Sequence, residues 1–154
     1  TDAHEFHLMG LKFAPYEIMF KLVRTHVLLP EGADLSEASL YDALGRGHAY
    51  FSIDLVADAG GFAFFAEDGR RVLGVMGDEA PLVSGLRLTA AAPAPAHLTL
   101  FRDGRAVAST TARTWQVPIT EPGAYRLEAI RQGKPWIFSN PIYVRSPTPG
   151  TPNH

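Results

Sequence analysis

The chain has 154 residues and a formal net charge of −2, and 46% of its residues are hydrophobic. That length allows one domain with a real core, or a small domain with an appendage. The nearly balanced charge gives no electrostatic reason to expect nucleic acid or an anionic membrane as a partner, so neither is predicted. The absence of cysteine excludes disulfide staples, a thiolate nucleophile and a cysteine zinc site, and it leaves the compartment open.

Neither a membrane span nor a targeting segment is visible. No apolar run approaches the roughly 18 to 20 residues that cross a bilayer. The first residue is Thr1 and not Met, so we expect that the natural N-terminus has been removed and that a leader could have been lost with it.

The first seven residues contain two imidazoles and two carboxylates. Asp2 and His4 stand in a D-x-H spacing, which places both side chains on one side of an extended segment. Carboxylates and neutral imidazoles are common ligands of zinc, iron and manganese, so one interpretation is part of a metal site. The other interpretation is a solvated polar tail with incidental histidines.

The next segment predicts a helix over residues 15–28. Pro15 suits a first helical turn, where its missing N–H costs nothing. Apolar residues recur at helical spacing and make a stripe, and His26 beside this stripe is expected to be a packed or capping residue and not a ligand. The stripe consists of Tyr16, Met19, Phe20, Val23 and Val27.

A second, short helix is predicted before residue 48. Asp34 offers an N-cap with Glu37 three residues later, which is a capping-box pattern. Apolar residues continue the helix to Leu44, and Gly45 or Gly47 would end it. The chain is therefore expected to be helical up to residue 47.

From residue 48 the pattern changes to a period of two, which is typical of strands that bury one face. We predict a mainly β fold, an immunoglobulin-like β-sandwich over residues 48–145, preceded by the short helical segment. The alternating rows are Ala49/Phe51/Ile53/Leu55, Leu86/Leu88, Leu98/Leu100, Trp115/Val117/Ile119, Tyr125/Leu127/Ala129 and Trp136/Phe138.

Turn residues separate these runs. Asp68-Gly69, Asp103-Gly104 and Gln132-Gly133 predict hairpins, because such pairs accept the positive φ of tight turns. Tyr125 follows a turn at residues 121–123 and invites comparison with the tyrosine corner of immunoglobulin-like sandwiches. The Ala/Pro-rich residues 90–96 are expected to leave the sheet and to connect one layer to the other.

Three further features have alternative interpretations. Asp78 and Glu79 are expected to be solvated turn acids, although a metal role is conceivable. Trp115 and Trp136 could form an exposed platform for a sugar, but large aromatic residues in alternating strands are more often core. The Pro-rich residues 146–154 predict an extended or disordered tail.

Motifs of common active sites are absent from the sequence: G-x-S-x-G, a P-loop, a dinucleotide-type glycine loop and H-E-x-x-H. A hydrolytic metal site normally needs three or more protein ligands, and only the first seven residues supply a cluster. This chain alone is therefore not expected to catalyse a reaction.

Two separated stretches resemble one enzyme family. Residues 1–4 resemble the last metal-binding motif of the polymerase-and-histidinol-phosphatase (PHP) family, a D-x-H after a late strand of a distorted β/α barrel. Residues 122–128 and 134–144 resemble the C-terminal β domain of the branch that includes metallohydrolases similar to carbaryl hydrolase. The most specific match is Pro135-Trp136-Ile137-Phe138-Ser139-Asn140-Pro141-Ile142-Tyr143.

The resemblance implies a role for the chain within a larger enzyme. Asp2 and His4 would ligate metal in the complete enzyme, where zinc, manganese or iron ions activate a water molecule. The remaining family ligands are absent, so residues 1–47 would be a barrel remnant, residues 48–145 an accessory sandwich and residues 146–154 a flexible tail. The rest of the barrel would be the partner, and helix 15–28 could pair with another copy.

Two other classes of function stay open. One is a carbohydrate- or protein-binding module that uses Trp115 and Trp136. The other is a small metalloenzyme that uses Asp2, His4 and His7.

Overall fold

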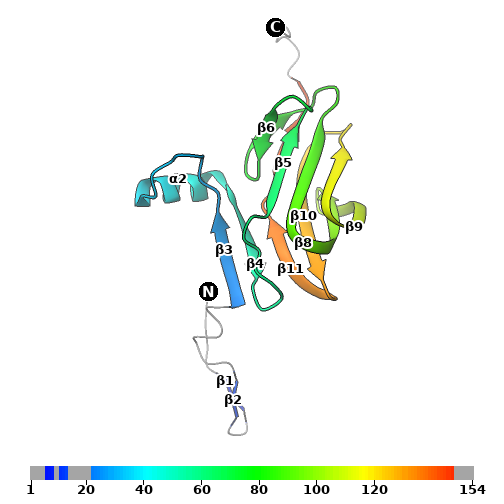
Figure 1. Ribbon diagram of the computed structural model, residues 1–154. Helices are drawn as coiled ribbons and strands as arrows, with labels where there is room; N and C mark the ends of the chain where they lie inside the picture. The colour runs from blue at the N-terminus through cyan, green and yellow to red at the C-terminus, as the bar shows by residue number, and fades with distance from the viewer. Residues whose placement is uncertain (1–5, 9–10, 14–21, 148–154) are drawn as a thin grey trace.

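The computed structural model describes residues 6–8, 11–13 and 22–147, and the fold is mainly β (Figure 1). In these ranges the chain forms β1 (Phe6–Leu8), β2 (Leu11–Phe13), β3 (Val23–Val27), α2 (Glu37–Arg46), β4 (Ala49–Ile53), β5 (Ala63–Glu67), β6 (Val72–Val75), β7 (Glu79–Pro81), β8 (Arg87–Arg102), β9 (Arg105–Pro118), β10 (Gly123–Arg131), β11 (Lys134–Ser139) and β12 (Ile142–Arg145).

Ten of the strands form one continuous sheet, and β1 and β2 form a separate antiparallel pair. The main sheet has the order β3-β4-β11-β10-β8-β5-β6, with β9 on β8, β12 on β10 and β7 on β12. Neighbouring strands are antiparallel except for the parallel pair of β7 and β12. The predicted mainly β class is therefore correct.

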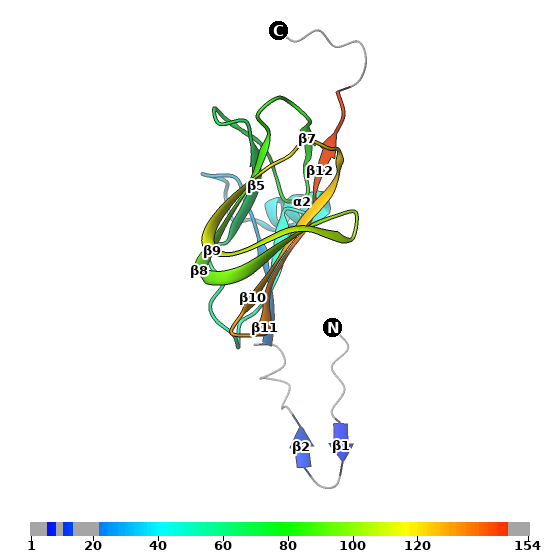
Figure 2. The same cartoon turned by 90° about the vertical axis from the view of Figure 1, so that its right-hand side faces the viewer.

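The sheet folds on itself because β8 belongs to both of its layers. Residues 87–91 of β8 pair with β5, and residues 97–102 pair with β10. Between these parts the register against β9 jumps from Ala91 to Ala96. β8 and β9 sweep from one layer to the other in Figure 2, and the buried faces meet in a sandwich-like core.

The expectation that residues 90–96 leave the sheet is wrong. They lie inside β8, although residues 92–95 have no partner in β9. Proline cannot donate to a ladder, so Pro93 and Pro95 interrupt pairing at a bulge without ending the strand. The expected passage between layers is thus made by a bent strand.

The predicted alternation accounts for most of the core. Residues 96–100 of β8 and 125–129 of β10 alternate between buried and more exposed, while in the first part of β8 Thr89 is buried as well as Leu88 and Ala90. Removing these apolar side chains from water is the main favourable term in folding. The buried side chains of β8 and β10, together with Leu86 just before β8, include Leu86, Leu88, Leu98, Leu100, Tyr125, Leu127 and Ala129.

The alternation fails in β11, where Trp136 and Ile137 are both buried and Phe138 is only half-buried. Ala129 pairs with Ile137 and Ile130 pairs with Pro135, so Trp136 is an extra residue in a bulge. A bulge turns a side chain toward a different face. Trp136 is fully buried, and its indole N–H donates to the carbonyl of Ala57 at 2.8 Å.

The predicted helix over residues 15–28 is wrong in its last part, because Val23–Val27 is strand β3 and pairs with β4. Val23, Thr25 and Val27 are β-branched and alternate along the strand, which suits a sheet better than a helix. Residues 14–21 lie outside the described residues. Val23 and Val27 therefore do not belong to a helical stripe, and pairing of this segment with another copy stays a prediction.

The second helix forms as predicted, but with a different cap. Ser36 is the N-cap of α2, since its hydroxyl accepts from the Ser39 N–H, and the Ser39 hydroxyl accepts from the Ser36 N–H. Asp34 instead contributes its carbonyl oxygen to the Ser39 hydroxyl. Gly47 ends the helix with φ 75°, in the left-handed region that favours glycine.

The three predicted hairpins are present. Asp103, Gly104, Gln132 and Gly133 have positive φ between β8 and β9 and between β10 and β11, and the turn at residues 68–71 joins β5 to β6. The Tyr125 hydroxyl donates to the Glu121 carbonyl at 2.9 Å, which is the contact expected of a tyrosine corner.

A close crossing of backbones holds the end of α2 on the sheet. The Asn140 side-chain amide donates to the Gly47 carbonyl at 2.9 Å, and the Gly77 N–H donates to the Pro141 carbonyl at 2.8 Å. A Cβ atom at Gly77 would lie 2.2 Å from the carbonyl oxygen of Arg46, so only glycine fits. This crossing is called the α2 joint below.

Candidate functional site

The two predicted metal ligands, Asp2 and His4, lie outside the described residues, and their metal role stays a prediction. His7 lies in β1, opposite Lys12. Within residues 6–8, 11–13 and 22–147 no group of three or more His, Cys, Asp or Glu side chains is arranged to hold a metal ion. No helix in these ranges is long and apolar enough to span a bilayer.

An imidazole and a carboxylate meet at the end of α2. His48 Nε2 lies 2.7 Å from Asp78 Oδ1, and Asp78 Oδ2 accepts from the Val75 N–H at 3.0 Å. Burial acts to raise the pKa of Asp78, but the bonds from Val75 and His48 outweigh it and lower the pKa. Asp78 is therefore held by hydrogen bonds to His48 and to the backbone and is not simply a solvated turn acid.

Three residues that could suggest a nucleophilic triad come together across β3 and β4. His26 Nε2 lies 2.9 Å from Ser52 Oγ, and the Ser52 hydroxyl donates to Asp54 Oδ1 at 2.5 Å. In a catalytic triad histidine lies between the hydroxyl and the carboxylate and takes the hydroxyl proton. Here the fully buried Ser52 is the middle member, so its proton points to Asp54.

This network has a structural role. Arg24 and Asp54 form an ion pair at 3.0 Å, and the His26 ring stacks on Tyr50 with centroids 4.4 Å apart. These contacts fasten β3 to β4, and the expectation that His26 is a packed residue is confirmed.

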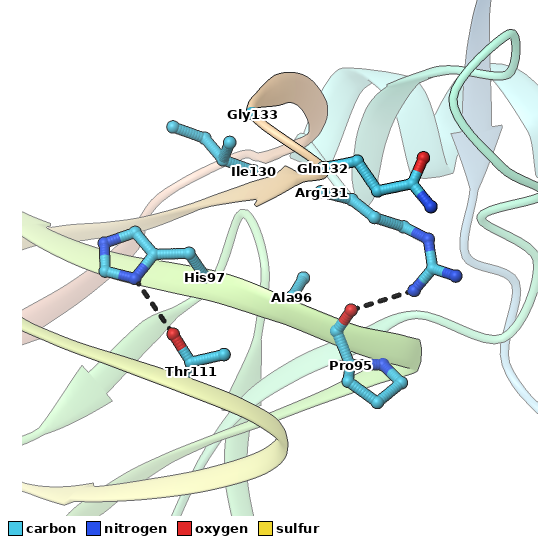
Figure 3. A pocket seen from close by; sticks show the side chains of 8 residues that line it. All are labelled: Pro95, Ala96, His97, Thr111, Ile130, Arg131, Gln132 and Gly133. Atoms are coloured by element: carbon cyan, nitrogen blue, oxygen red, sulfur yellow. Dashed lines mark hydrogen bonds between the residues drawn. The ribbon is translucent and has the colours of Figure 1, made fainter.

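A hollow of about 430 Å³ lies on the outer face beside the bend of β8. Figure 3 shows His97 and Thr111 on one side of it and Arg131 and Gln132 on the other. His97 Nδ1 is 3.3 Å from the Thr111 hydroxyl, and the Arg131 guanidinium donates to the Pro95 carbonyl at 2.9 Å. The hollow offers hydrogen bonds, but its arginine is already engaged with the backbone.

A second opening lies between the two layers, where β9 borders the core. This interlayer slot has a volume of about 200 Å³. Arg102 and Glu121 form an ion pair at its rim, 2.5 Å apart, and this pair raises the pKa of Arg102. Burial raises the pKa of Tyr125 beside them. The apolar lining residues are Leu100, Val107, Ala108, Val117 and Ile119.

Sequence reasoning did not find the slot. Leu100 pairs with Ala108 and Phe101 with Ala106, so Val107 is an extra residue in a bulge of β9. No turn or motif in the sequence marks that bulge, because it depends on the register of β8 against β9.

The alternative in which Trp115 and Trp136 together form an exposed platform is not supported. Trp136 is fully buried, and Trp115 is partly buried and packs against the core. The core interpretation of these residues is confirmed for Trp136.

No protein-family model, curated protein or solved structure matches the chain. The PHP resemblance stays a prediction that rests on the residues quoted for it.

Proposed function

We propose that this chain is the C-terminal part of a PHP-type metal-dependent hydrolase of the carbaryl hydrolase-like branch. In this proposal the β unit is an accessory domain with a structural or assembly role and is not catalytic by itself. Asp2 and His4 complete a metal centre whose other ligands come from the preceding barrel.

The observation that carries the proposal concerns residues 134–144, on which the resemblance mainly rests. Four of them, Trp136, Ile137, Ile142 and Val144, are at most 1% exposed. Asn140 and Pro141 make the α2 joint, which fixes the lead-in helix to the sheet. The stretch with the family-like sequence therefore also holds the end of α2 on the sheet, which supports a bracing role.

Asp2 and His4 are chemically suited to be two ligands of a metal site whose other ligands come from elsewhere in the protein. One carboxylate and one imidazole are suitable ligands for zinc, manganese or iron, but a hydrolytic centre needs at least one more protein ligand. When bound, the metal would supply a hydroxide near neutral pH. Asp2 and His4 would be two of the ligands that hold the metal ion.

The test is a comparison of metal content and phosphoesterase activity. In the whole natural protein, Asp2→Asn and His4→Asn should each lower the bound manganese or zinc per chain and the activity about tenfold or more. Mutation of a residue that only hydrogen-bonds to a metal ligand already costs that much. His97→Asn, in the outer-face hollow, is the matched control and should change neither. The isolated chain should bind less than one metal ion.

Two results would contradict the proposal. One is unchanged metal content in both ligand variants of the whole protein. The other is stoichiometric metal and hydrolytic activity in the isolated chain, which would favour the small-metalloenzyme hypothesis with Asp2, His4 and His7.

A further inference from the structure

β9 is a long edge strand. It has 14 residues and pairs only with β8 among the strands in the described part of the chain. The other edge of such a strand carries backbone N–H and C=O groups that can pair with another extended segment. The other edge strands in the described part of the sheet, β3, β6 and β7, have five, four and three residues and offer shorter ladders.

The side of the sandwich along β9 is incompletely covered. The residues of β9 that face the core are only partly buried, whereas their partners in β8 are almost fully buried. One more strand beside β9 would cover this row. The β9/β8 pairs are Ala108/Leu100, Thr110/Leu98, Ala112/Ala96, Trp115/Ala90 and Val117/Leu88.

The interlayer slot opens on the same strand. The bulge at Val107 leaves this side chain 47% exposed, next to the buried Leu100 and near Val117. In peptide recognition by strand addition, main-chain hydrogen bonds give affinity and side-chain pockets give specificity. The slot has a size suited to one apolar side chain.

The charges on β9 indicate the chemistry of the partner. Arg105 is the first residue of β9 and Arg113 lies eight residues further along it, both are exposed, and β9 contains no acidic residue. Opposite charges across an interface favour association and fix register. An incoming strand should therefore carry two acidic residues, one to face Arg105 and one to face Arg113, with an apolar residue between them for the slot beside Val107.

We propose that β9 is a docking edge for an extended segment of another polypeptide, one that has an apolar residue for the slot and acidic residues near each end. The segment adds a strand to β9, and its apolar side chain enters between the layers beside Val107. This function is independent of the metal chemistry proposed above.

The probe is a synthetic decapeptide in which Val and Thr alternate and a Glu stands near each end. Backbone amide NMR of the chain during titration should show saturable shifts in β9 and in the slot residues. Val107→Glu should weaken binding about tenfold or more, because a carboxylate would be buried without a partner in the slot. Val72→Glu, at a similarly exposed valine of edge strand β6, should leave the affinity unchanged.

Two controls test whether binding is strand addition and whether the Val107→Glu variant folds. A decapeptide with prolines at its centre should not bind, since proline cannot donate to a ladder. Equal thermal midpoints of the two valine variants and the parent chain would show that Val107→Glu folds. The proposal is overturned if β9 amides do not shift, if Val107→Glu binds as well as the parent, or if β9 pairs with a second copy when no peptide is added.

Discussion

Asp78 carries a carboxyl group whose pKa is lowered in the folded protein. Its carboxylate accepts hydrogen bonds from the Val75 N–H and from His48, and these lower its pKa although burial acts in the opposite direction. A lowered folded-state pKa contributes stability above the ordinary aspartate value of about 3.9. That contribution disappears as the pH falls below this value.

Asp78→Asn should therefore reduce the acid sensitivity of the protein. Between about pH 6 and about pH 3, the free energy of unfolding in urea should fall by up to about 1 kcal/mol less in the variant than in the parent. The effect is small because the Asp78 side chain is 36% exposed and solvent screens it. Asp68, whose pKa is lowered by the N–H groups of Arg70 and Arg71, leaves residual acid dependence.

Asp42→Asn is the matched control for this measurement. Asp42 pairs with Arg46 on the exposed side of α2, where both side chains are more than 60% exposed. Surface pairs of this kind contribute little, so the control should keep the acid dependence of the parent. Identical pH profiles for Asp78→Asn and the parent would show that the His48–Asp78 contact does not contribute.

At the scale of elements, the α2 joint leaves no room for a side chain at Gly77. Gly77→Ala should lower the free energy of unfolding by more than about 2 kcal/mol, because Gly77 has φ 95° and its new Cβ would overlap the backbone of Arg46 and Gly47. Chemical denaturation followed by circular dichroism measures the change.

Gly45→Ala, in α2 close to the α2 joint, is the matched substitution. A Cβ at Gly45 meets no atom within 4 Å, and alanine is a better helix former by about 1 kcal/mol. This variant should be as stable as the parent or slightly more stable. A similar loss in both alanine variants would argue against backbone crossing as the cause.

Elements with local signals could be predicted from the sequence, and elements that depend on distant partners could not. The hairpins at Asp103-Gly104 and Gln132-Gly133 form because those residues accept positive φ whatever surrounds them. For β3 the sequence carries two signals, since the β-branched Val23, Thr25 and Val27 alternate as in a strand but Val23 and Val27 also fit a helical stripe. The ladder with β4, a distant partner, decides between them.

The same contrast applies to the candidate sites. The D-x-H at Asp2 and His4 is a local motif, and its metal role stays a prediction. The interlayer slot is produced by the bulge at Val107, the bend of β8 at residues 92–95 and the inter-layer approach of Leu100 and Val117. None of these relations has a fixed spacing in the sequence.

At the scale of the whole molecule, β8 and β9 link the two layers into one folding unit. β8 pairs with β5 in one layer and with β10 in the other, and β9 follows β8 through both layers. Each layer therefore shares these two strands with the other. We expect unfolding to be a single transition, as is usual for domains of this size.

Single-tryptophan variants can test this expectation. Trp115 lies in the half of β9 that pairs with residues 87–91, and Trp136 lies in β11 of the other layer. Within Trp136→Phe and within Trp115→Phe, the fluorescence midpoint in urea should coincide with the midpoint from far-ultraviolet circular dichroism. Separate midpoints within either variant would indicate that the layers unfold independently.

The ladder between β3 and β4 determines where the gene can be shortened. A shortened protein that started at residue 48 would keep β4 but lose β3. Tyr50 and Ser52 would then lose their contacts with the imidazole of His26. The edge of β4 that β3 had covered would then expose unpaired backbone N–H and C=O groups and promote aggregation. Soluble production of the sandwich therefore calls for a start upstream of Val23.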